Sequence, residues 1–253
     1  MPVIDPRLIW NQTAAVEFFS RHRSRKEQLY ESERQLLPAL LAPGLRVLDV
    51  GCAAGGLLAV MQEYQPDIDY VGVDCSPLMV QEARRRFPAA WFDVSDATRL
   101  PFVEDSFDLV ICTGGTLVTN LAWRDVLREC WRVTRDRFLF DLRVVTEGET
   151  IEDVMRSWVR LAFHGDQASA PIAPYVIVNV TTFREMLASF QPAPCQVGGV
   201  GYWHAVSDMA STPHQEVCMV QVALTKCPMP TGSGLQWKVP FPQEPSPSSQ
   251  CHK

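Results

Sequence analysis

The sequence predicts an α/β fold: a doubly wound, mostly parallel seven-stranded sheet with an antiparallel C-terminal hairpin and an N-terminal helical lid. Five apolar runs have the length of buried strands: 45–50, 69–74, 90–94, 107–112 and 137–142. Three segments with helical spacing alternate with them: 56–64, 77–87 and 121–134. A chain that alternates strands and helices forms a parallel sheet with helices on both faces, joined by right-handed crossovers.

The segments outside this alternation define the expected domain boundaries. Residues 1–43 form the lid, since apolar residues recur there near a helical period until Ala42-Pro43-Gly44 ends the pattern. The main domain spans 44–226, with its substrate-specific elements at about 149–204. The elements after the fifth strand are expected in this order: a helix over 149–163, an extended segment over 175–180, a helix over 181–190, and strands over 195–203 and 216–225. Residues 227–253, rich in proline and serine, predict a disordered tail.

Composition favours a cytoplasmic protein and argues against nucleic acid and membranes as partners. The formal net charge of −6 argues against a large nucleic-acid footprint. No apolar run reaches the roughly 18 residues that a membrane-spanning helix needs. The eight cysteines include no Cys-x-x-Cys pair, so we expect free thiols and no metal site. The basic cluster at 21–26 is the local exception: a solvated helix face, or an edge for an anionic substrate such as RNA.

A turn of small residues follows the first strand and begins a helix. Strand residues Val47–Val50 run directly into Gly51-Cys52-Ala53-Ala54-Gly55-Gly56, and the second strand ends in Asp74. Such a turn lets backbone approach a ligand at a helix N-terminus, and an acid roughly 20 residues later can bind both ribose hydroxyls. The spacing therefore predicts a nucleoside site.

The spacing within this turn distinguishes two classes of nucleoside. A dinucleotide fingerprint would place glycines at 51, 53 and 56, and Ala53 replaces the glycine that lets backbone approach a pyrophosphate. The pattern that is present is an acid followed by two glycines: Asp49, Gly51 and Gly55. Asp49 suits a ligand with an ammonium group, whereas it would repel a pyrophosphate.

This pattern resembles motif I of the class I S-adenosylmethionine-dependent methyltransferases, of the type that acts on small molecules. Further matches follow in order over roughly residues 45–142: Asp74, Asp96-Ala97, Leu100-Pro101-Phe102, Ser106–Ile111 and Arg128–Thr134. Two departures are Ala53 in motif I and Thr134–Arg137 in place of the usual Pro-Gly-Gly turn before strand five. The resemblance implies S-adenosylmethionine as cofactor. It also implies a set of cofactor-binding residues: Asp49, Gly51, Cys52, Ala53, Gly55, Asp74, Cys75, Asp96, Ala97, Cys112 and Thr113.

Two acceptor classes of the family are disfavoured by residues at the end of the fourth strand. Cys112 stands where cytosine-C5 methyltransferases keep their nucleophile, but the Pro-Cys pair of that group is missing, which favours a buried small residue. The Asp/Asn-Pro-Pro-Tyr tetrapeptide of enzymes that methylate amino groups of adenine or glutamine is replaced by Thr113–Thr116.

Residues on the acceptor side carry less specific signals. Tyr30 and Asp141 are our candidate catalytic residues: Tyr30-Glu31-Ser32-Glu33 resembles a stretch of the small-molecule enzymes, whose N-terminal helices cover the cofactor, and Asp141 leaves strand five toward the cleft beside Arg143. Asp141 and Arg143 either orient a polar substrate or form structural ion pairs. The candidates for a general base are His22, Tyr30, His164 and His204, and for aromatic walls Trp10, Tyr202 and Trp203.

The sequence thus predicts an enzyme that moves the methyl group of S-adenosylmethionine to a small molecule, with oxygen the favoured acceptor atom and carbon or nitrogen as alternatives. Alignment of donor and acceptor and exclusion of water are the main requirements, and a base is needed only if the acceptor must lose a proton. A competing hypothesis is an NAD-dependent oxidoreductase, which Ala53 and the lack of a Tyr-x-x-x-Lys motif disfavour. A non-catalytic nucleoside-binding member of the fold and an RNA methyltransferase are two further hypotheses that the sequence leaves open.

Overall fold

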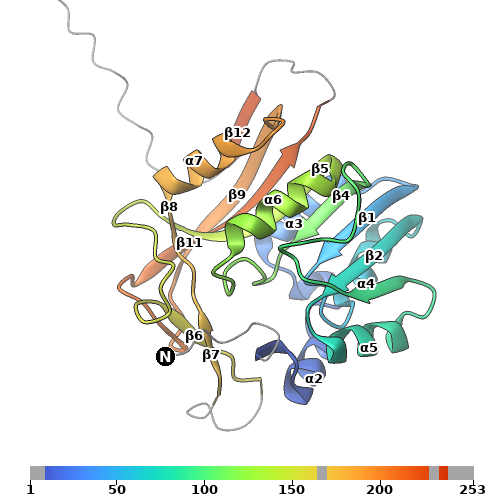
Figure 1. The fold of residues 1–253 in the computed structure, drawn as a ribbon, viewed down its shortest axis with the longest axis horizontal. Helices are drawn as coiled ribbons and strands as arrows, with labels where there is room; N and C mark the ends of the chain where they lie inside the picture. The colour runs from blue at the N-terminus through green and yellow to red at the C-terminus, as the bar shows by residue number, and fades with distance from the viewer. Residues whose placement is uncertain (1–8, 164–169, 228–233, 239–253) are drawn as a thin grey trace, which may run out of the picture.

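A mostly parallel sheet forms the centre of the molecule (Figure 1). The computed structural model describes residues 9–163, 170–227 and 234–238, the last segment as backbone only. The sheet holds nine strands in the order β12-β9-β11-β5-β4-β1-β2-β3, with β8 paired to β5. Their bounds are β1 Leu45–Val50, β2 Ile68–Asp74, β3 Trp91–Val94, β4 Phe107–Cys112, β5 Thr134–Val145, β8 Val178–Asn179, β9 Gln196–Ala205, β11 Glu216–Thr225 and β12 Gly234–Lys238.

The seven expected strands are present and pair as predicted. Strands β3, β2, β1, β4 and β5 are parallel neighbours, and β11 and β9 add an antiparallel hairpin beside β5. The short β8 lies in the segment expected to be extended over 175–180 and pairs with β5, whereas the edge strand β12, which runs parallel to β9, was not expected. β12 lies within the segment expected to be a disordered tail, whose other residues after Cys227 lie outside the described ranges.

Helices cover both faces of the sheet, as the alternation of strands and helices predicted. The helices are α2 Thr13–Arg21, α3 Glu31–Leu40, α4 Gly56–Tyr64, α5 Pro77–Arg86, α6 Trp123–Val133 and α7 Val180–Ser189, with a 3-10 turn at Lys26–Gln28. Side chains of α6 and α7 join one core cluster, and side chains of α3, α4 and α5 join the other. Strand β4 supplies both clusters, since Val110 faces the first and Leu109 and Ile111 face the second. Successive side chains of β4 therefore point to opposite faces of the sheet, and each face packs against its own layer of helices.

The prediction of a helix over 149–163 is wrong. The chain there forms β6 Trp158–Arg160, which pairs with β7 Ile172–Pro174 and β10 Ala210–Ser211 in a small antiparallel sheet. The Ser157 hydroxyl donates to the carbonyl of Tyr175 at 2.6 Å, and Ile151 pairs with Ile177. Partners distant in sequence therefore satisfy the backbone that the local pattern would have given to a helix.

The expectation that all eight cysteines are free is also wrong. Cys195 and Cys227 form a disulfide, with Cα atoms 5.8 Å apart. The two residues lie just before β9 and just after β11, which are antiparallel neighbours, so the hairpin brings them together. Their separation of 32 residues gave no sign of this in the sequence.

In the described part of the N-terminal lid, a break separates the helices α2 and α3. The lid, expected to be helical within residues 1–43, forms α2 and α3 there, joined by residues 22–30. Arg23 in this connection has a φ of 57°, a left-handed conformation that a non-glycine residue adopts only when its surroundings stabilise it. Among the described residues, no helix has the length and apolar character to cross a bilayer.

Candidate cofactor and acceptor site

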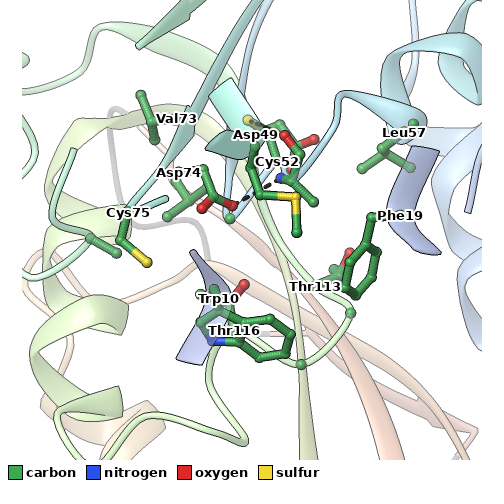
Figure 2. Close-up of a pocket in the computed structure, with 18 of the residues that line it drawn as sticks. Trp10, Phe19, Asp49, Cys52, Leu57, Val73, Asp74, Cys75, Thr113 and Thr116 are labelled. Carbon is green, nitrogen blue, oxygen red and sulfur yellow. Dashed lines mark hydrogen bonds between the residues drawn. The ribbon is translucent and has the colours of Figure 1, made fainter. Parts of the chain in front are cut away.

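A cavity of about 300 Å³ opens where β1, β2 and β4 end, beneath the N-terminal lid. Figure 2 shows Asp49, Cys52 and Asp74 close together, with Trp10 and Thr116 across the cavity from them. We call the lining residues from the strand ends and their loops the sheet wall. The lining residues from the lid form the lid wall: Trp10, Phe19, His22 and Arg23.

Most of the cofactor residues expected from sequence line this cavity. Nine do so: Asp49, Gly51, Cys52, Ala53, Asp74, Cys75, Asp96, Ala97 and Thr113. Cys112 does not, because its side chain faces the core on the α6 side of β4, where it contacts Cys130. Gly55 also lies outside the lining and begins α4 with a φ of 76°. A Cβ there would lie 3.0 Å from atoms of the Phe87 and Phe92 rings, so its role in the structure is local.

The turn after β1 needs its left-handed residues. Gly51 has a φ of 80°, and a side chain there would collide with the hydroxyl of Thr116. Ala53 adopts a φ of 47°, which costs an L-residue about 1–2 kcal/mol. Its amide N–H donates to Asp74 at 2.9 Å, so the acid at the end of β2 stabilises the turn after β1.

Asp74 combines a structural role with the geometry expected for ribose binding. Its Oδ2 accepts the Ala53 N–H, and its Oδ1 accepts the Ser76 N–H at 2.8 Å. Burial raises its pKa, while these backbone hydrogen bonds oppose the increase. Each carboxylate oxygen has a second lone pair, so both can still accept a hydroxyl from a ligand in the cavity.

Asp49 is a buried acid that accepts one side-chain hydrogen bond, and the group that donates it is neutral. The Tyr70 hydroxyl donates to its Oδ2 at 2.7 Å. Burial raises the pKa of Asp49 to about 7, although the hydrogen bond from Tyr70 favours the ionised form. Within the described part of the chain, neither Asp49 nor Asp74 forms an ion pair. The sheet wall therefore favours a ligand that brings positive charge and disfavours a pyrophosphate.

Arg23 is the functional residue that the sequence did not single out. It belongs to the basic cluster at 21–26, yet its guanidinium lies at the cavity with its side chain only 18% exposed. It donates to both carboxylate oxygens of Glu33, at 2.7 and 3.0 Å, and to the Thr113 hydroxyl at 3.3 Å. Burial alone would raise the pKa of Glu33, but the charge of Arg23 and its hydrogen bonds lower it. Arg21, Arg25 and Lys26 of the same cluster are exposed.

Gly56 in the turn allows the lid to approach this closely. A Cβ at Gly56 would lie 2.7 Å from the carbonyl oxygen of Arg23, so only glycine lets the lid contact the first turn of α4. The Gly-Gly pair at 55 and 56 was thus the available signal, but it did not identify the partner segment.

Aromatic rings close the cavity from the lid. Trp10 and Phe19 line it, and they pack with Phe18 and Phe163 at centroid distances of 5.1–6.0 Å. We call these four rings the aromatic roof. Phe163 follows β6, so the small antiparallel sheet and the N-terminal lid meet at this roof.

Tyr30 and Asp141, the candidate catalytic residues, lie behind the lining. Asp141 accepts the Gly114 N–H at 2.8 Å and pairs with Arg143 at 3.0 Å. The Tyr30 ring has the Arg23 and Arg143 guanidinium carbons 5.4 and 5.7 Å from its centroid. This arrangement gives Asp141 a positioning role for the loop that lines the cavity, and any direct part in catalysis stays a prediction.

The remaining acceptor-side candidates divide between the cavity and the rest of the chain. His22 and Trp10 line the cavity, whereas Tyr202, Trp203 and His204 of β9 are not part of its lining. His164 lies outside the described residues. In the described part of the chain, no group of three His, Cys, Asp or Glu side chains is placed to hold a metal ion.

Comparison with known proteins agrees with this geometry. Residues 47–137 match the sequence model of a methyltransferase domain. The chain therefore carries a methyltransferase domain over these residues. S-Adenosylmethionine, the cofactor that the sequence predicts, carries sulfonium and ammonium groups with the positive charge that the sheet wall favours.

Similar proteins show where the likeness ends. The chain is 41% identical over 103 residues to a demethylmenaquinone methyltransferase of Roseiflexus sp. (strain RS-1), a match that covers 38% of this chain and 42% of the relative. A demethylmenaquinone methyltransferase of Beutenbergia cavernae is 42% identical, over 40% of this chain and 42% of its own length. The matches to these curated relatives span about two fifths of their length. A structure of a SAM-dependent methyltransferase from Methanosarcina mazei shares the fold, with a TM-score of 0.53, 14% identity, and coverage of 78% of this chain and 98% of that one.

Proposed function

We propose that the protein transfers the methyl group of S-adenosylmethionine to a small, flat, quinone-type or phenolic acceptor, with oxygen as the acceptor atom. One observation carries the cofactor part: two buried acids, Asp49 and Asp74, line one wall and form no ion pair with any described residue. S-Adenosylmethionine supplies a methyl group that is already activated on a positively charged sulfur.

Different residues of the cavity lining bind different parts of this cofactor. In this proposal Asp74 accepts hydrogen bonds from the ribose hydroxyls, Asp49 binds the ammonium group, and Asp96 and Ala97 contact the adenine. Asp96 also accepts hydrogen bonds from Thr98, so one of its oxygens has a structural role as well. His22 and Arg23 are the two basic residues of the lining, and Arg23 suits the carboxylate of the cofactor because two of its five N–H donors remain after its bonds to Glu33 and Thr113.

Two observations support a flat aromatic acceptor. The aromatic roof offers apolar ring faces to the cavity through Trp10 and Phe19. The relatives from Roseiflexus and Beutenbergia carry the name demethylmenaquinone methyltransferase. The cavity of about 300 Å³ lies at the lower end of small-molecule sites, so the lid must shift to admit an acceptor beside the cofactor.

Calorimetric titration tests the cofactor part. We expect S-adenosylmethionine and S-adenosylhomocysteine to bind and NAD not to bind. Asp74→Asn should weaken binding about 100-fold, since it disturbs hydrogen bonds to a charged group worth about 1.5–3 kcal/mol each. Asp69→Asn is the matched control, because Asp69 lies on the same strand, exposed and far from the cavity lining. Binding of NAD alone would contradict the proposal.

Transfer of a radiolabelled methyl group tests the acceptor part. The panel contains reduced 1,4-naphthoquinone, catechol and aliphatic hydroxy acids, with the products resolved by mass. We expect methylation of the aromatic members. Methylation of aliphatic acids alone would keep the cofactor assignment and overturn the acceptor class.

A further inference from the structure

His22 has the surroundings of a general base on the lid wall of the cavity. It lines the cavity and is also exposed, so it lies where the cavity meets solvent. Its ring stacks on Phe18 with centroids 3.9 Å apart and an interplanar angle of 11°. Phe18 belongs to the aromatic roof, so the packing that closes the cavity also holds the imidazole.

The hydrogen-bond partner of the ring determines its tautomer. Nδ1 of His22 lies 2.7 Å from the carbonyl oxygen of Phe18. A carbonyl oxygen only accepts hydrogen bonds, so Nδ1 must carry the proton. In the neutral ring Nε2 then has the free lone pair, which is the arrangement a general base requires.

The titratable groups elsewhere in the lining are occupied. Five of them belong to the sheet wall: Asp49, Cys52, Asp74, Cys75 and Asp96. Asp74 holds the turn, and Asp49 is suited to the ammonium group of the cofactor. Burial raises the pKa of Cys52 well above its ordinary value, which keeps the thiol protonated. Cys75 hydrogen-bonds to Asp74. His22 is therefore the basic group of the lining that remains for an acceptor on the lid side.

We propose that His22 is the general base that deprotonates a hydroxyl acceptor, an inference that rests on the proposed methyltransferase function. The acceptor O–H bond breaks and its proton goes to Nε2 of His22. The oxygen lone pair forms the new O–CH₃ bond as the S–CH₃ bond breaks, and that bonding pair stays on sulfur as a thioether lone pair. The exposed imidazolium then returns its proton to solvent.

The tautomer can be measured without knowing the acceptor. The full-length protein labelled with ¹⁵N-histidine is studied by two-bond ¹H–¹⁵N spectroscopy, with and without saturating S-adenosylhomocysteine. The His22 signals are assigned by their loss in His22→Asn. We expect the Nδ1–H tautomer and a change of the Nε2 shift when S-adenosylhomocysteine binds. An Nε2–H tautomer, or a His22 ring that does not respond to bound S-adenosylhomocysteine, overturns the proposal.

Kinetics distinguishes a base from a packing residue. His22→Asn keeps an N–H donor near the Phe18 carbonyl and removes the basic nitrogen. We expect kcat, measured with an acceptor that the wild-type protein methylates, to fall about 100-fold or more. The Kd of S-adenosylhomocysteine should be unchanged. Added imidazole should restore part of the rate in His22→Ala. Arg21→Gln, an exposed change at the end of the same helix, is the control. Unchanged kcat in His22→Asn contradicts the proposal. A wild-type protein that binds S-adenosylmethionine and methylates nothing contradicts the proposed function instead. In that case the tautomer measurement decides on His22.

Discussion

The two walls of the cavity are built by different interactions. In the sheet wall, backbone N–H groups make the contacts: those of Gly51 and Cys52 donate to the carbonyl of Val73 at 2.8 and 3.0 Å, and that of Ala53 donates to the side-chain carboxylate of Asp74. In the lid wall, side chains make the contacts: Arg23 pairs with Glu33, and the rings of the aromatic roof pack together.

This difference indicates which wall moves. Backbone hydrogen bonds between adjacent strands break only when the sheet is disrupted, whereas an ion pair and a few ring contacts can open without unfolding the domain. The sheet wall is thus formed before a ligand binds, and we expect the lid wall to open for exchange of cofactor and acceptor. Substitutions in each wall test this division, and the largest effect is expected at Arg23.

Arg23→Gln should affect stability and cofactor recognition together. It leaves the buried carboxylate of Glu33, 1% exposed, without its cation, which costs about 3–5 kcal/mol of unfolding free energy. The double variant Arg23→Gln with Glu33→Gln removes the unpaired charge and should recover most of this loss in urea denaturation. Binding of S-adenosylhomocysteine should stay weak in both variants. Binding of 5′-methylthioadenosine, which lacks the amino acid part, should stay close to wild type in the double variant. Equal weakening of both ligands there would show that Arg23 does not bind the carboxylate.

Asp49 should make cofactor binding pH-dependent from the sheet wall. Its pKa of about 7 lies above the ordinary value of 3.8, so the carboxyl loses charge as pH falls through neutrality. The cofactor ammonium needs the ionised form, so affinity for S-adenosylhomocysteine should fall about tenfold per pH unit below the midpoint. In the ligand-free protein the sign is opposite: the raised pKa stabilises the fold most below about pH 4, and this contribution is lost as pH rises to about 7.

Two variants make this pH prediction specific. Tyr70→Phe removes the hydrogen bond that favours the ionised form, so the midpoint of the binding profile should move to higher pH. Asp49→Asn should remove the pH dependence and weaken binding at every pH. Calorimetry from about pH 5.5 to about pH 8.5 measures both, with 5′-methylthioadenosine as the ligand that lacks the ammonium group. A flat wild-type profile for S-adenosylhomocysteine contradicts this role of Asp49.

The contrast between the walls also explains what the sequence could and could not predict. The sheet wall depends on local constraints: Gly51 needs a left-handed φ, and Asp49 and Asp74 end neighbouring strands. Such constraints leave residue types at fixed spacing. The lid wall depends on contacts between distant segments, such as Phe163 against Trp10, and single aromatic residues carry no mark of their partner.

Particular failures of prediction have the same cause. The basic cluster at 21–26 gave no sign that Arg23 turns inward while Arg21, Arg25 and Lys26 stay exposed, because this depends on Glu33 and Thr113. The segment 149–163 does not form the expected helix, because part of it pairs as a strand with residues that follow it in the chain. Cys112 was placed at the cofactor by its position after strand four, but alternation along β4 turns it toward α6.

Removal of the Phe163 ring should give the smallest effect and the most direct reading of lid motion. Phe163→Ala removes contacts with Trp10, Phe18 and Phe19, at about 0.5–1.5 kcal/mol for an aromatic pair, and leaves the sheet wall intact. We expect S-adenosylhomocysteine to dissociate about three- to tenfold faster in stopped-flow measurements of Trp10 fluorescence. Met155→Ala, at a side chain 63% exposed in the segment before β6, is the matched control and should dissociate like wild type. If Phe163→Ala also matched wild type, the small antiparallel sheet would have no part in holding the lid, and closure would depend on Arg23 and Glu33 alone.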